Sequence, residues 1–217
     1  MPTRKTTNKS NHTKSNHIKT KKTKQSQTRT NNSGGCRLIP LNKINNKQLF
    51  QLAMITKDKS IMKHIGRGNT WSITDLKQFI KDENLESKKP IIKRQYYTFI
   101  MVCNNDVVGF IAGRKNKKLL PPESTPHDLL LRMFISRNYS GKGLGKQIIK
   151  LFITYYSRIL SNITSNKNSN SKPNKLVADI DKDNIASIKI HTANGFIHKD
   201  TITYPNKHNY ERYEFII

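Results

Sequence analysis

The chain has 217 residues, 34 % of them hydrophobic, which suits one globular domain with further chain outside its core rather than two full domains. Its 40 basic and 14 acidic residues give a formal net charge of +26, an excess that repels itself unless anionic partners or disorder relieve it. No run approaches the roughly 18 consecutive apolar residues that span a bilayer, and the N-terminus lacks the apolar stretch of a secretory signal. We therefore expect a soluble, intracellular protein without membrane contact.

Residues 1–35 form a basic tail with nine Lys or Arg, no Asp or Glu, and Ile18 as the only aliphatic residue after the initiator. Such a composition buries too little apolar surface to offset the cost of ordering the backbone, so we predict disorder. The basic run at 19–24 is also typical of a nuclear-import or nucleic-acid patch. The cytoplasm is the expected location, with the nucleus and weak, non-specific nucleic-acid contact as the alternatives that this tail leaves open.

The two cysteines, Cys36 and Cys103, show no CxxC spacing and have no histidines clustered near them. Neither a disulfide framework nor a zinc site is therefore indicated. This cysteine usage favours a reducing compartment.

The globular domain is expected over residues 36–217, beginning with a short strand at 37–41 and a helix through 49–53. Ser72 and Asp75 have nearly the spacing and chemistry of a capping box, so a second helix is expected after Ser72. The apolar face of that helix comprises Leu76, Phe79 and Ile80.

Two β-rich runs, 95–103 and 106–114, follow and are joined by Asn104 and Asn105, which tolerate turn conformations. They predict an antiparallel hairpin. A third apolar run at 129–135 leads straight into a glycine-rich turn and then a helix. The helical spacing after the turn involves Leu144, Ile148, Leu151, Phe152, Tyr155 and Ile159.

The last part of the chain begins with a low-complexity stretch at 161–175, which we interpret as a loop inserted in the fold. After it we expect a strand at 176–180, a short helix at 187–193, and two closing strands at 197–204 and 210–217. The order of elements predicts a mixed α/β fold with a central sheet.

The glycine turn, read as Ser-Gly-Lys-Gly-Leu-Gly over residues 140–145, has the properties of a phosphate site. Glycines let backbone N–H groups approach an anion, and the following helix adds the positive end of its dipole. The dinucleotide fingerprint is excluded because Lys146 stands where it needs a third glycine. The Walker loop is excluded because it requires a glycine where this chain has Ser140 and a Ser or Thr where it has Gln147.

The turn resembles the cofactor motif of the GNAT superfamily of acetyl-CoA-dependent N-acetyltransferases, Gln/Arg-x-x-Gly-x-Gly/Ala, with Ser140 departing from the usual Gln or Arg. Downstream, residues 181–187 read Asp-Lys-Asp-Asn-Ile-Ala-Ser and residues 191–196 read His-Thr-Ala-Asn-Gly-Phe, which resemble a second signature of that family. His191, where many members have Tyr, makes the motif most similar to the phosphinothricin-type branch that acetylates small amines.

The resemblance implies the GNAT fold, an α/β fold of α+β type whose mixed, mostly antiparallel sheet is splayed between two middle strands and flanked by about four helices. It implies that the backbone of Met133, Phe134 and Ile135 holds the pantetheine arm and polarises the thioester carbonyl, with Asn184 on the other side. The residues implied to bind the pyrophosphate are Ser140, Gly141, Lys142, Gly143, Leu144, Gly145 and Lys146.

The activity implied is direct attack of a primary amine on acetyl-CoA in a ternary complex, with no metal. His191 occupies the position of the acid that protonates the departing thiolate. For the base, the strand carboxylate of related enzymes has no counterpart, so Asp179 and a water relay are both candidates. A basic nucleic-acid-binding protein and a GNAT fold that binds CoA without catalysis are the alternative functions. No pattern in the loops at 115–128 and 205–209 indicates which amine is the acceptor.

Overall fold

The computed structural model describes residues 35–65, 68–115, 118–164, 173–204 and 209–217. The predicted disordered tail, its nucleic-acid patch and most of the predicted loop insertion lie outside these residues. Within them, seven strands form one sheet in the order β1-β2-β3-β4-β5-β7-β6. The strands are β1 (Cys36–Pro40), β2 (Tyr96–Cys103), β3 (Asp106–Arg114), β4 (Leu129–Ile135), β5 (Lys175–Asp181), β6 (Ile197–Thr203) and β7 (Asn209–Ile216).

Five α-helices occur in the described part of the chain, one more than the approximate number expected. They are α1 (Asn46–Thr56), α2 (Lys59–Met62), α3 (Ile73–Ser87), α4 (Leu144–Thr164) and α5 (Ile185–Thr192). The additional helix is α2, a single turn capped by Asp58, too short to produce an apolar periodicity. Short 3₁₀ turns are η1 (Leu41–Lys43), η2 (Ile91–Lys93) and η3 (Arg137–Tyr139). None of the described helices has the length and apolar character to cross a bilayer.

The local signals in the sequence form as predicted. Ser72 and Asp75 make a reciprocal capping box at the start of α3. Asn104 and Asn105 adopt φ values of 51° and 69°, the left-handed pair that a two-residue hairpin between β2 and β3 needs. A second capping box, from Asn45 and Gln48, starts α1 and was not predicted.

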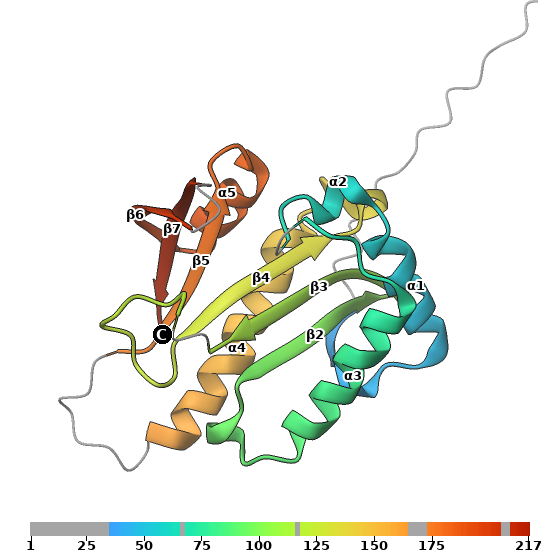
Figure 1. Ribbon diagram of the computed structural model, residues 1–217, viewed down its shortest axis with the longest axis horizontal. Helices are drawn as coiled ribbons and strands as arrows, with labels where there is room; N and C mark the ends of the chain where they lie inside the picture. The colour runs from blue at the N-terminus through green and yellow to red at the C-terminus, as the bar shows by residue number, and fades with distance from the viewer. Residues whose placement is uncertain (1–34, 66–67, 116–117, 165–172, 205–208) are drawn as a thin grey trace, which may run out of the picture. The chain divides into compact units, whose positions relative to one another are not determined.

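The helices cover both faces of the sheet (Figure 1). Alternate residues of β2 point to opposite faces, and the two faces form separate apolar clusters. Phe99 and Met101 lie in the cluster that contains Phe152 of α4, whereas Ile100 lies in the cluster that contains Leu52 of α1. The sheet therefore separates α4 from α1 and α3.

The buried face of α4 is shifted from the predicted one. The large buried side chains of α4 are Ile148, Ile149, Phe152, Tyr156, Ile159 and Leu160. Leu144, Leu151 and Tyr155 of the predicted face are only partly buried, because they lie at one border of this stripe. Ile149, Tyr156 and Leu160, at the other border of the stripe, are buried and were not part of the predicted face.

The two middle strands separate along their length, as the GNAT resemblance implies. β4 and β5 run parallel and pair at only two positions, Leu129 with Leu176 and Leu130 with Val177. Beyond these, β4 continues on β3 and β5 continues on β7, while the edges that face each other part. We call this gap in strand pairing the splay.

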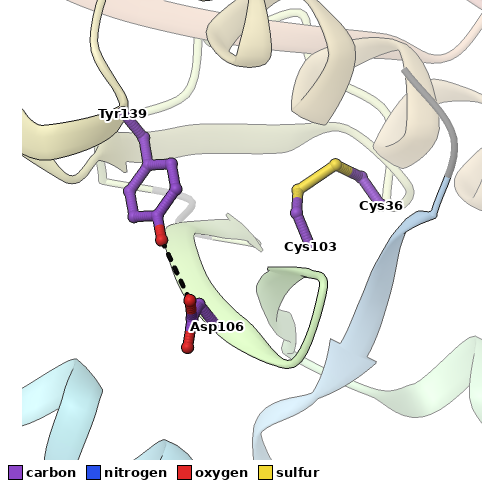
Figure 2. Close-up of a disulfide and its surroundings, with 4 residues drawn as sticks. All are labelled: Cys36, Cys103, Asp106 and Tyr139. Carbon is purple, nitrogen blue, oxygen red and sulfur yellow. Dashed lines mark hydrogen bonds between the residues drawn. A yellow bond between two sulfur atoms is a disulfide. The ribbon is translucent and has the colours of Figure 1, made fainter. Parts of the chain in front are cut away.

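The cysteines differ from expectation, because Cys36 and Cys103 form a disulfide (Figure 2). They are paired across β1 and β2, with Cα atoms 4.2 Å apart. Cα atoms at this separation lie close to the range in which a bridge can form. The disulfide could not be predicted from the sequence, because the two residues are 67 positions apart and only the pairing of the strands places them opposite each other.

Candidate active site

The glycine turn connects the end of β4 to the start of α4 through η3. Gly141 and Gly143 have φ values of 72° and 76°, a left-handed conformation that glycine adopts without the cost of a side chain. A Cβ built on either residue would meet nothing within 4 Å. The space above both glycines is therefore open to a ligand.

The N-terminus of α4 points its backbone donors into this turn. Gln147 donates to the carbonyl of Gly143 at 3.2 Å, so the N–H groups of Leu144, Gly145 and Lys146 precede the first intrahelical bond. Donors of this kind, together with the helix dipole, stabilise an anion. The predicted cofactor residues from 141 to 146 are thus brought together in a geometry that fits a pyrophosphate.

Gly145, unlike Gly141 and Gly143, lies against another helix. It is buried, and a Cβ on it would lie 2.6 Å from Cδ1 of Ile190. The glycine therefore allows α5, which carries Ile190, to pack closely against the start of α4. This contact joins the two sequence motifs.

The start of the turn is anchored by residues that the sequence did not reveal. The hydroxyl of Tyr139 donates to Asp106 at 3.2 Å, next to the disulfide (Figure 2). Asp106 also accepts from Gln51 of α1 at 2.9 Å. Lys142 lies over the Tyr139 ring, 5.0 Å from its centroid, and donates to the carbonyl of Asn138. Ser140, between them, is exposed.

The backbone of β4 presents alternate residues to the splay. The amide of Ser136 donates to Val108 of β3 at 2.8 Å, so every second residue, Phe134 included, points its N–H and C=O toward β3. Met133 and Ile135 then point theirs toward the splay. The prediction for these two positions fits the geometry, and that for Phe134 does not. Phe134 instead packs its ring on Phe110, with centroids 5.1 Å apart.

Asn184 stands at the N-terminus of α5, where its side-chain oxygen accepts from the amide of Ser187 at 3.2 Å. Because Oδ1 is used to cap the helix, a contact with the cofactor falls to Nδ2. Asp181 shapes the turn before it, accepting from the amides of Asp183 and Asn184.

His191 is buried in α5, with only 3 % of its surface exposed. Its Nδ1 lies 2.8 Å from the carbonyl of Ser187, and its ring meets Phe196 edge-on. Burial lowers the pKa of His191 to about 4, against a smaller opposing effect of the Ser187 carbonyl. With such a pKa, about one molecule in a thousand is protonated at neutral pH. This environment does not favour the predicted role as an acid.

The side chain of Asp179 is only 4 % exposed and forms an ion pair with Arg212 of β7. Nε of Arg212 lies 2.7 Å from Oδ1 and Nη2 lies 2.9 Å from Oδ2. The hydroxyl of Tyr204 donates to Oδ2 as well, and burial beside this carboxylate raises the pKa of Tyr204. Both carboxylate oxygens of Asp179 therefore already accept hydrogen bonds within the protein. The geometry does not support Asp179 as the base.

Two side chains near the splay were missed by sequence reasoning. His64, just after α2, places Nδ1 3.6 Å from Oδ2 of Asp181, the last residue of β5. Arg132 is exposed on β4, and its charge opposes the rise that burial causes in the pKa of Tyr204. His64 sits in no motif, so only the packing of its loop beside β5 reveals it.

Parallel strands that part beside a helix N-terminus can hold an extended, phosphorylated arm, which is the arrangement of a coenzyme A-dependent acyltransferase. The family model described as "Acetyltransferase (GNAT) domain" matches residues 37–197. The chain belongs to this family, and it is an N-acetyltransferase that uses acetyl-CoA to modify an amine. No curated protein matches the sequence.

Solved structures share the fold at low sequence identity. The ribosomal L7/L12 α-N-protein acetyltransferase RimL with coenzyme A is 16 % identical, with a TM-score of 0.64 over 85 % of this chain and 96 % of that one. The aminoglycoside acetyltransferase AAC(6')-Ib with acetyl-CoA is 15 % identical, with a TM-score of 0.62 over 84 % and 92 %. Spermidine N-acetyltransferase from Vibrio cholerae with CoA and spermine is 11 % identical, with a TM-score of 0.60 over 83 % and 95 %.

Proposed function

We propose that the acceptor is a primary amine on a molecule that also has an anionic group close to that amine. The observation that supports this is Arg132, an exposed cation on β4 beside the splay. Two carboxylates near the splay already have partners. Asp179 pairs with Arg212, and Asp181 lies beside the ionisable His64. An acceptor with several positive charges would meet Arg132 without a free carboxylate to balance it.

Three solved structures with this fold come from proteins whose names point to different acceptors: aminoglycosides, spermidine, and the N-terminus of a ribosomal protein. The charge at Arg132 favours an α-amine, the last of these kinds, over the polycations, provided that acidic residues follow that amine. Small amino acids, with a carboxylate two bonds from the amine nitrogen, satisfy the same requirement.

Bound acetyl-CoA supplies the activated acetyl group, and the residues of this chain orient it. The turn at Gly141–Gly145 holds the pyrophosphate through backbone N–H groups, and the amides of Met133 and Ile135 bind the arm and polarise the carbonyl in the splay. The attacking amine has to lose a proton. With Asp179 engaged by Arg212, we assign that proton to His64, whose Nδ1 lies 3.6 Å from Asp181, and a water relay is the competing route.

The acceptor proposal is tested by comparing kcat/KM for two short peptides that differ only in having Asp or Lys after a free N-terminal residue. We expect the acidic peptide to be preferred by about fivefold to tenfold, as one partly screened ion pair allows. Arg132→Gln should remove the preference and Arg132→Asp should reverse it. Arg114→Gln, on the neighbouring strand, is the matched control and should leave it intact. Equal rates for both peptides in the unmodified chain would refute the anionic acceptor while leaving acetyl transfer itself in place.

A further inference from the structure

A second candidate site lies at the outer edge of β2, where a cavity of about 290 Å³ opens. β1 pairs with β2 only as far as Pro40 opposite Phe99, after which η1 carries the chain away. The first residues of β2, from Tyr96 to Thr98, therefore have an outer edge that β1 does not cover. Side chains from both faces of the sheet meet around this edge.

The polar end of the cavity is Glu83 of α3. This residue is only 8 % exposed, and no donor in the described part of the chain reaches its Oε1. Burial raises the pKa of Glu83 to about 7, the nearby charge of Glu86 adds to the rise, and a hydrogen bond with Thr98 opposes it. A buried carboxylate oxygen without a donor costs free energy, so its retention at the wall of a cavity points to a ligand that donates to it.

Four of the eleven residues that line the cavity are aromatic. Tyr96, Tyr97, Phe99 and Tyr155 line the cavity, and the rings of Phe99 and Tyr155 meet edge-on with centroids 4.7 Å apart. The hydroxyl of Tyr97 already donates to the carbonyl of Ile91 at 2.7 Å. Aromatic faces combined with a carboxylate are the groups that recognise an organic ammonium ion.

The two cations of the lining do not fill this role. Arg94 directs its guanidinium to backbone carbonyls, with Nη2 2.8 Å from the carbonyl of Ser87 and Nε 3.3 Å from that of Lys89. Lys43 is an exposed residue of η1. Arg94 is thus committed to backbone partners, and Oε1 of Glu83 still lacks a donor.

The cavity is separate from the place of acetyl transfer. Tyr96 pairs with Arg114, which pairs with Leu130 at the beginning of β4, whereas the glycine turn follows the other end of that strand. Figure 1 shows the start of β2 and the end of α3 at the end of the sheet opposite to the tip of β4.

We propose that this cavity is a second amine site, which binds the ammonium group of a small organic amine through the carboxylate of Glu83 and the aromatic rings around it. The amine bound there is a ligand and not an acceptor. The proposal needs no acetyl transfer, so it stands or fails independently of the proposed function.

The test uses the full chain at about pH 8, where the carboxylate and the probe are both charged. The probe is N,N-dimethylbenzylamine, whose protonated form has one N–H to donate but, as a tertiary amine, gives no stable N-acetyl product. Benzyl alcohol is the neutral control. Calorimetric titration should detect binding of the amine and at least about tenfold weaker binding of the alcohol.

Two variants localise the binding. Glu83→Gln should weaken it at least about tenfold, because the charge is lost. Ser87→Leu should abolish it by filling the cavity while leaving Glu83 in place, which covers a failure of the first variant to fold. Glu123→Gln, an exposed carboxylate elsewhere, should have no effect. Absence of amine binding, equal binding of the alcohol, or unchanged binding in Ser87→Leu would overturn the proposal.

Discussion

Asp179 and Arg212 lie directly opposite each other on β5 and β7 and form a bidentate ion pair beside the splay. Arg212 also donates to the carbonyl of Leu119 at 2.6 Å, so the pair ties the loop before β4 to the second half of the sheet. This contact explains an acidic residue on a strand between two buried apolar ones, at Ala178 and Ile180.

Asp179→Asn should destabilise the protein strongly, because Arg212 is left buried without a counter-charge. Removing one partner of such a pair costs about 3–5 kcal/mol. Urea unfolding monitored by circular dichroism measures the loss, with the exposed Asp200→Asn as a control that should unfold like the parent. If Asp179 were the base instead, turnover would fall while the unfolding midpoint stayed in place.

His191 should contribute to the pH dependence of stability. Burial holds the folded pKa of His191 at about 4, below the ordinary histidine value of 6.5, so the unfolded chain takes up a proton at a higher pH than the folded chain does. The contribution is therefore complete above pH 6.5 and is lost as pH drops toward 4, by up to about 3 kcal/mol. His191→Phe should flatten the unfolding free energy over this window and keep turnover within about twofold at neutral pH. A large loss of turnover at an unchanged melting temperature would restore His191 to the catalytic residues.

His64→Gln tests the route of the proton. If His64 removes it, kcat should fall by about 100-fold. Asp181→Asn should reduce kcat less, because Asp181 lies beside the ring and does not itself take the proton. His198→Gln, an exposed histidine on β6, is the control. A kcat within about twofold of the parent value in His64→Gln would assign the proton to water.

Glu83 should act on stability in the direction opposite to His191. Its folded pKa of about 7 lies above the ordinary glutamate value of 4.5, so stability falls as pH rises between these values, by up to about 3 kcal/mol. Burial is the main cause of the raised pKa, Glu86 and Asp82 add to the rise, and Thr98 and Arg94 oppose it. Glu83→Gln should raise the free energy of unfolding at pH 8 but hardly at pH 4. Chemical unfolding at the two pH values measures this, and a parallel loss at both would contradict it.

Much of the fold could be predicted because its signals are local. The capping residues of α3, the Asn104–Asn105 hairpin and the boundaries of β4 each depend on neighbouring residues only. The same holds for the glycine turn, whose conformational demands are carried by Gly141 and Gly143 themselves.

What the sequence could not show depends on residues far apart in the chain. Asp179 and Arg212 are 33 positions apart, and the disulfide joins positions 67 apart. Whether an Asp is a free base or half of an ion pair, and whether a His in a motif is exposed or buried, is decided by strand order and packing. For that reason the sequence could indicate a glycine turn that fits a pyrophosphate, whereas the surroundings of Asp179 and His191 could not be predicted from it.

We propose above all that the turn at Gly141–Gly145 binds the pyrophosphate of acetyl-CoA, so that the acetyl group can be transferred to an amine. The most direct measurement is calorimetric binding of acetyl-CoA to the parent chain, Gly143→Ala and Gly143→Glu, followed by release of free CoA thiol on addition of amine. Gly143→Ala should weaken binding modestly, because its φ of 76° costs about 1 kcal/mol, and Gly143→Glu should abolish binding by repelling the phosphates. Acetyl-CoA binding of equal strength in the Gly143→Glu variant would contradict the account.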